Sequence, residues 1–112
     1  YREGLSTISG IFCPKLPDAT IYNYAYFSIL IEKEYPLSRD ELNEKLREHG
    51  IFPRRYFYPL ISEFPMYRGL SSSAKSNLPC ASKLADQVLC LPIYPALKSE
   101  DQQRIIEVIQ AI

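Results

Sequence analysis

The sequence predicts a single α+β domain in which helices pack on one face of a three- or four-stranded, mainly antiparallel sheet. Its 112 residues suit one hydrophobic core. With 46% hydrophobic and 23% charged residues, the composition is typical of a folded globular chain and not of a disordered one. Segments with strand and helix periodicity are mixed, without the strict alternation that a parallel sheet with crossover helices requires.

The chain begins with two short elements and one long predicted strand. Residues 1–8 resemble the tail of a helix, and residues 11–13 form a short strand before a proline-containing loop. Residues 21–31 alternate strictly, so that one strand face is aliphatic and the other carries a ladder of tyrosines, namely Tyr22, Tyr24 and Tyr26. The ladder is either a sheet face covered by helices or the wall of a ligand site, because tyrosine offers a flat apolar ring and a polar tip.

A helix with complete start and stop signals follows. Ser38 is the N-cap, Glu41 closes a capping box, and Leu42 belongs to the buried stripe. Gly50 supplies the C-terminal stop. His49, the only histidine, is therefore expected to be a helix-end residue and not a catalytic base.

Residues 51–58 read as another strand, placed at a sheet edge or paired only after Pro53, because proline cannot donate a ladder hydrogen bond. Residues 60–67 could form one helical turn. The serine-rich residues 69–79 are typical of a mobile loop.

The last third predicts a short amphipathic helix after Pro79, an apolar strand over residues 89–91, and a final helix. Ser99 and Gln102 suggest a second capping box that opens this final helix. Its buried side should consist of aliphatic residues, namely Ile105, Ile106, Val108, Ile109 and Ile112.

Charge and cysteine usage limit the possible partners. The chain has 13 Lys and Arg against 13 Asp and Glu, so no broad positive field favours nucleic acid or an anionic membrane. No apolar run approaches the length of a membrane span. Cys13, Cys80 and Cys90 are odd in number and lack metal-site spacing, so we expect small buried apolar side chains and a cytoplasmic setting.

The strongest candidate binding site is the cluster of Arg54, Arg55, Tyr56 and Tyr58. On an extended strand, Arg54, Tyr56 and Tyr58 would share one face, with Arg55 on the other. Guanidinium groups bind phosphates through forked, charge-assisted hydrogen bonds, and tyrosine hydroxyls can complete the shell of donors. The alternative is structural: one arginine is solvated and the other pairs with a glutamate such as Glu63.

Recognised catalytic arrangements are absent from the sequence. It contains no GxSxG, phosphate-binding P-loop, GxGxxG or HExxH motif, and no metal-ligand cluster. We therefore expect no catalytic residue, no metal site and no cofactor-binding residue within the 112 residues.

Four segments occur in an order that resembles one known family: YREGL (1–5), NYAYF (23–27), RRYFYPL (54–60) and VLCLPIYP (88–95). This order is similar to the C-terminal domain of the DegT/DnrJ/EryC1/StrS sugar aminotransferases, over essentially all 112 residues. Within the family the chain looks most like the enzymes that make 4-amino-4,6-dideoxyglucose on a thymidine diphosphate carrier, or a 3-amino relative. Many relatives carry a histidine where this chain has Ile61, so any function of that histidine is lost or supplied otherwise.

The resemblance implies a pyridoxal-phosphate enzyme of fold type I, normally a homodimer, that moves an amino group from glutamate to a keto-sugar nucleotide. Residues 1–112 would be its single C-terminal domain, with residues 1–8 continuing a helix from a missing large domain that carries the Schiff-base lysine. None of the six lysines stands in the family's lysine motif, so the chain alone is expected neither to bind the cofactor nor to transaminate. The domain would instead close the sugar-nucleotide cleft.

A different interpretation remains open from the sequence: a stand-alone α+β module that binds a ligand or a protein through the tyrosine ladder and the arginine pair. The keto-sugar and the ring position that is aminated do not follow from the sequence.

Overall fold

A computed structural model of the protein describes all residues from 1 to 112. Its centre is a three-stranded antiparallel sheet in the order β1-β2-β3, formed by β1 (Ile11–Phe12), β2 (Phe27–Ile31) and β3 (Val88–Leu91). The register places Ile31 opposite Ile11 and Ile29 opposite Leu89. The predicted α+β class with a mainly antiparallel sheet is confirmed.

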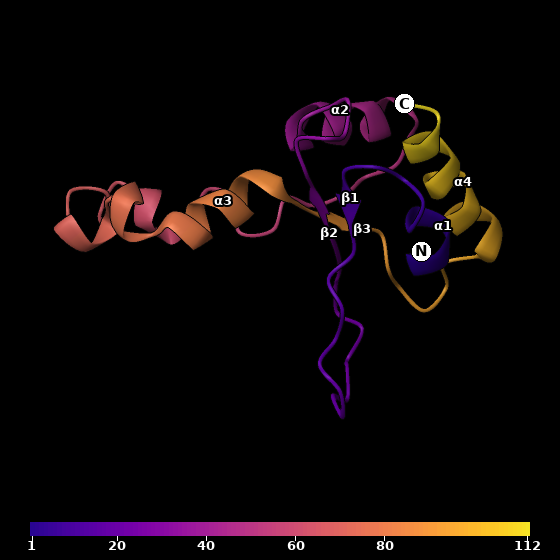
Figure 1. The fold of residues 1–112 in the computed structure, drawn as a ribbon, viewed down its shortest axis with the longest axis horizontal. Coiled ribbons are helices and arrows are strands. Elements are labelled where there is room, and N and C mark those ends of the chain that lie inside the picture. Colours follow the sequence, from indigo (N-terminus) through magenta and orange to yellow (C-terminus); the bar gives the residue numbers. More distant parts are fainter.

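Three helices cover the core: α1 (Arg2–Leu5), α2 (Arg39–Glu48) and α4 (Ser99–Gln110). Figure 1 shows α1 and α4 side by side, and α2 beside the same sheet. Alternate residues of β2 and β3 join these helices in one cluster of buried side chains, because successive strand residues point to opposite faces. The cluster includes Ile29, Ile31, Leu89, Leu91, Leu42, Leu46, Ile105, Ile106 and Ile109. No helix combines the length and apolar character needed to cross a membrane.

Helix α2 forms as its sequence signals predict. The Glu41 amide donates to Ser38 Oγ at 3.3 Å, and the Ser38 amide donates to Glu41 Oε2 at 2.8 Å, which completes the capping box. Gly50 adopts φ +72°, the left-handed conformation that ends a helix. His49 caps the helix, and its Nδ1 lies 2.9 Å from the Lys45 carbonyl, so its helix-end placement is confirmed.

The predicted strand over residues 21–31 is wrong in its first half. β2 begins only at Phe27, and residues 14–26 form an irregular projection, here called the finger (Figure 1). Tyr24 has φ +54°, and the side chain of Asn23 accepts a hydrogen bond from the Ala25 amide at 3.1 Å. This local turn breaks the extended backbone, so the tyrosine ladder does not form.

The predicted strand over residues 51–58 is also wrong. Only Arg54 pairs with the sheet, through a single bridge to Cys90. The backbone then turns, because Phe57 adopts φ +47°, and the alternation of faces is lost.

The chain next leaves the sheet as an extension over residues 55–87, here called the arm (Figure 1). Its single turns are η1 (Ile61–Glu63), η2 (Ser71–Ser73) and η3 (Lys75–Asn77), and it returns through α3 (Pro79–Gln87). The helical turn and the helix after Pro79 agree with prediction. α3 contributes no side chain to the core cluster.

Three smaller expectations are corrected. The final helix is capped by Lys98 without a side-chain bond, so Ser99 is already helical and its hydroxyl cannot act as the predicted cap. The helix in residues 1–8 spans only Arg2–Leu5. Cys90 is buried as expected and Cys13 is partly buried, but Cys80 is exposed because it lies in the first turn of α3, outside the core.

Candidate functional site

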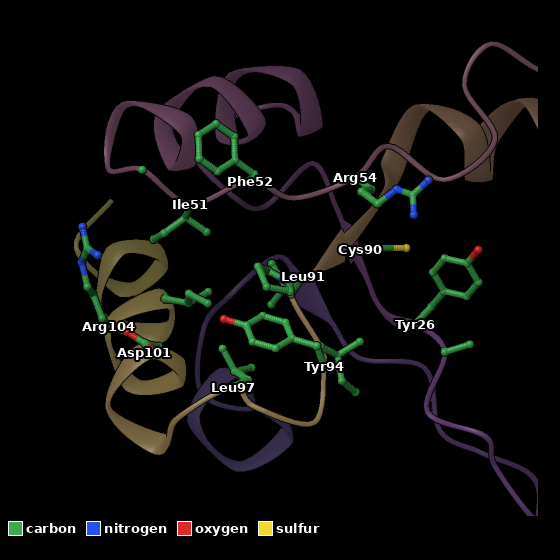
Figure 2. Close-up of a pocket in the computed structure, with 15 residues that line it drawn as sticks. Tyr26, Ile51, Phe52, Arg54, Cys90, Leu91, Tyr94, Leu97, Asp101 and Arg104 are labelled. Atoms are coloured by element: carbon green, nitrogen blue, oxygen red, sulfur yellow. The ribbon is translucent and has the colours of Figure 1, made fainter.

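A cavity of about 450 Å³ lies where the base of the finger, the end of β3 and the start of α4 meet. Ten of its fifteen lining residues are hydrophobic, which is typical of a ligand site that needs a few well-placed polar groups. Figure 2 shows Arg54, Cys90 and Tyr26 together at one end, while Asp101 and Arg104 project from α4 at the other. Phe52 and Tyr94 add aromatic surface between them.

Arg54 is held by its backbone and leaves its guanidinium available. Its amide donates to the Cys90 carbonyl at 2.9 Å, and its carbonyl accepts from the Cys90 amide at 2.8 Å. The guanidinium takes part in none of the salt bridges of the structure and in no side-chain hydrogen bond. A fixed backbone beside an unpaired cation suits the binding of an anion.

The Cys90 thiol beneath Arg54 is not a nucleophile. Burial raises the pKa of this thiol, and the hydrogen bond with Ser28 and the charge of Arg54 offset only part of the rise. Its Sγ lies 3.4 Å from Ser28 Oγ. A protonated, buried thiol is chemically inert, so Cys90 is a small apolar part of the cavity wall.

Tyr56 does not line the cavity itself but packs against a second tyrosine that does. Its ring stands edge-to-face against Tyr26, with centroids 5.0 Å apart, and its other neighbour is Phe57 at 4.0 Å. Tyr26 is itself a lining residue. Of the four side chains predicted to bind substrate, Arg54 alone lines the cavity, with Tyr56 behind Tyr26.

Arg55 and Tyr58 belong to a different cluster, at the root of the arm. Arg55 Nη1 lies 3.3 Å from Asp40 Oδ1, and the Arg55 guanidinium lies 4.4 Å from the centre of the Tyr58 ring. The sequence left open a pairing of one arginine with a glutamate such as Glu63. Glu63 instead pairs with Lys75 at 3.5 Å, so the arginine's partner is Asp40.

Sequence reasoning did not find the α4 end of the cavity. Asp101 and Arg104 lie about one helical turn apart on α4, and Arg104 Nη2 donates to the His49 carbonyl at 2.6 Å. Nothing in their local sequence marks them, because the cavity is formed by segments that are far apart in the chain. The basic and aromatic residues from Arg54 to Tyr58 pointed only to the opposite end of the cavity.

The cavity offers no lysine that could form a Schiff base with pyridoxal phosphate. The six lysines are all exposed and none of them lines the cavity. No group of three potential metal ligands is found anywhere in the chain. A Schiff base to the cofactor therefore has no partner at this site.

Comparison with known proteins gives a consistent result. A family model described as the DegT/DnrJ/EryC1/StrS aminotransferase family matches residues 1–110. The chain is 51% identical over 100 residues, 89% of its length, to a dTDP-4-amino-4,6-dideoxy-D-glucose transaminase of Escherichia coli. It is 40% identical over its whole length to an enzyme of the same name from Shigella dysenteriae.

Solved structures agree. The crystal structure of DesI, determined in the presence of its TDP-sugar product, matches 98% of the chain with a TM-score of 0.87 and 28% identity. DesV of S. venezuelae, in complex with a ketimine intermediate, matches 98% with a TM-score of 0.83 and 31% identity. The chain spans 27% and 30% of the length of the two curated relatives, and 28% of each of these two solved chains.

Proposed function

The chain belongs to the DegT/DnrJ/EryC1/StrS aminotransferase family, and from this premise we propose that it is the C-terminal domain of a pyridoxal-phosphate-dependent nucleotide-sugar aminotransferase. The whole protein transfers an amino group from glutamate to a dTDP-linked keto-deoxysugar and works as a homodimer in the cytoplasm. The names of the relatives support the substrate class. The partners are the two substrates and a second subunit, not nucleic acid or a membrane.

The cofactor is held by the rest of the whole protein, because no lysine of this chain lies at the cavity. When bound, it supplies the electron sink that transamination needs. The residues of this chain have a different role, since they bind and orient the nucleotide-sugar and keep water from the cleft that the domain closes.

Arg54 carries this proposal. Its unpaired guanidinium at the end of an aromatic-lined cavity matches a diphosphate group, whose oxygens accept forked hydrogen bonds. Tyr56, which packs on Tyr26, contributes a hydroxyl or a ring face beside the same group. Arg55 and Tyr58, which the sequence grouped with Arg54, lie beside it at the root of the arm and do not line the cavity.

The test is steady-state and single-turnover kinetics of Arg54→Ala in the whole protein. Losing a hydrogen bond to a charged group weakens binding by about 10- to 150-fold, so KM for the keto-sugar nucleotide should rise within this range. The first half-reaction with glutamate should not change, since it needs no diphosphate contact. Arg68→Ala is the matched control, because Arg68 is an exposed arginine far along the arm.

An unchanged KM in Arg54→Ala would refute the assignment. If Arg55→Ala were then the damaging change, the diphosphate contact would belong to Arg55. If both variants behaved as the unmodified protein does, the arginine pair would be purely structural.

A further inference from the structure

The buried side chain of Arg39 joins both ends of the arm to helix α2. Arg39 is only 3% exposed, although it is charged. Its Nη1 donates to the carbonyls of Ala85 at 2.8 Å and Val88 at 3.3 Å, where the arm returns to the sheet. Its guanidinium also lies 4.9 Å from the centre of the Tyr58 ring, where the arm departs. One side chain therefore contacts both ends of the arm and holds them together at its root.

Asp40 and Tyr58 complete this closure. Asp40 Oδ1 lies 2.8 Å from Arg39 Nε and 3.3 Å from Arg55 Nη1, so two guanidinium groups share one carboxylate. The Tyr58 ring contacts the same two groups. Arg39, Asp40, Arg55 and Tyr58 are here called the arm anchor.

The arm anchor adjoins Arg54. On one side, Arg54 is fixed by its two backbone hydrogen bonds with Cys90. On the other, the next residue is Arg55, whose side chain is tied to Asp40 at the start of the capped helix α2. Between Arg55 and Tyr58 the backbone turns, with φ +47° at Phe57. Without the anchor, the Cys90 bridge and the packing of Tyr56 on Tyr26 would be the remaining contacts that hold this segment.

We propose, as an extension of the function proposed above, that Asp40, Arg55 and Tyr58 are positioning residues that orient Arg54 toward the nucleotide-sugar diphosphate. They act through the geometry of Arg54 and do not themselves contact the substrate. Their side chains contact one another, since the guanidinium groups of Arg39 and Arg55 share the Asp40 carboxylate and the Tyr58 ring. Preorganisation of this kind lowers KM because the binding side chain needs no ordering when the substrate arrives.

The test uses substitutions in the whole protein. Tyr58→Leu removes the aromatic ring. Losing a cation–π contact of this kind should raise KM for the keto-sugar nucleotide about three- to tenfold. The half-reaction with glutamate should not change. Tyr58→Phe keeps the ring and should restore KM to within about twofold of the unmodified protein. Equal damage by Phe and Leu would mean that the hydroxyl binds the substrate, which overturns the positioning role.

Asp40→Asn is the second variant, with Glu48→Gln as its matched control on the same helix. Glu48 pairs with Lys45 at 3.1 Å and makes no salt bridge or side-chain hydrogen bond to the arm. Asp40→Asn should raise KM in the same way as Tyr58→Leu, whereas Glu48→Gln should leave it unchanged. Equal effects of the two substitutions on KM would mean that Asp40 is only a surface charge of α2, which would overturn its positioning role.

A double-mutant cycle separates the anchor from the site it serves. In an Arg54→Ala background, Tyr58→Leu should add less than about twofold to KM, because the residue it positions is gone. A full additional rise would show that Tyr58 acts independently, against the proposal. If Arg54→Ala alone raises KM while Tyr58→Leu and Asp40→Asn do not, the anchor fails and the proposed function stands. If Arg54→Ala itself is silent, both proposals fall.

Discussion

The sheet with its three covering helices and the arm are built on different principles. The first region encloses a cluster of thirteen buried side chains drawn from all three strands and from α1, α2 and α4. In the arm, Ala85 is the only buried residue, and apolar side chains stay exposed on its surface, including Phe57, Ile61, Met66, Tyr67 and Leu70. The core is stabilised by burial, whereas the arm depends on local turns and on its root.

The difference shows where function can be located. The Arg54 end of the candidate cavity and the arm anchor both lie at the junction between the two regions, where Arg54 pairs with β3 and the chain turns outward. The sheet fixes the backbone there. The side chains of the departing arm do not pack in the core, so they are free to take part in a site. Exposed apolar surface of the kind the arm carries commonly marks a contact with another part of a protein.

The largest expected effect is the contrast between two leucines. Leu89 in β3 is fully buried, whereas Leu70 in the arm is more than half exposed. Leu89→Ala should lower the free energy of opening of the β3 amides by about 2–5 kcal/mol, the usual loss of transfer energy plus a cavity. Leu70→Ala should change it by less than about 0.5 kcal/mol. Native-state hydrogen exchange measures both. Similar values for the two variants would show that the arm is part of the cooperative core.

The same contrast explains what the sequence could predict. Helix α2 was predicted in detail because its capping box and glycine stop act over a few residues. The tyrosine ladder failed because alternation indicates a strand only where one face is buried, and Tyr24 lies in an exposed projection. Arg54 was identified because its aromatic and basic neighbours are adjacent in sequence. Asp101 was not, because its part in the cavity depends on how α4 packs.

A second prediction tests the core side through pH. The Tyr35 hydroxyl is buried and donates to the Ile109 carbonyl at 2.8 Å, and burial raises the pKa of Tyr35 to about 12 from an ordinary value near 10. The neutral phenol is therefore favoured in the folded state. Its contribution to stability is complete below pH about 10 and is lost as the pH rises toward about 12.

Tyr35→Phe should cost about 1.5 kcal/mol at neutral pH, from the lost hydrogen bond. It should also make the loss of stability between pH about 10 and about 12 shallower, because phenylalanine cannot ionise. Some slope should remain, since burial also raises the pKa of Tyr1 to about 12. Urea unfolding followed by circular dichroism measures both effects. An unchanged alkaline slope would mean that Tyr35 ionises as freely in the folded chain as in the unfolded one.

The smallest expected effect compares two serines that the sequence marked alike as helix caps. Ser38 makes its cap bond to the Glu41 amide, and α2 carries the root of the arm, so the cap supports the junction directly. Ser99 makes no cap bond, because α4 begins after Lys98. Ser38→Ala should lower stability by about 1 kcal/mol, and Ser99→Ala should change it by less than about 0.5 kcal/mol.

The Ser38 cap also has a pH signature. The hydrogen bonds with Ser38 lower the pKa of Glu41, so the ionised carboxylate is favoured in the folded state. Its contribution to stability is present above the ordinary pKa of glutamate and is lost as the pH falls through the lowered value. Ser38→Ala should therefore flatten the acid limb of the stability profile, while Ser99→Ala should leave it unchanged. Equal losses of stability in Ser38→Ala and Ser99→Ala would mean that α4 also begins with a side-chain cap, and that the cap of α2 is not distinctive.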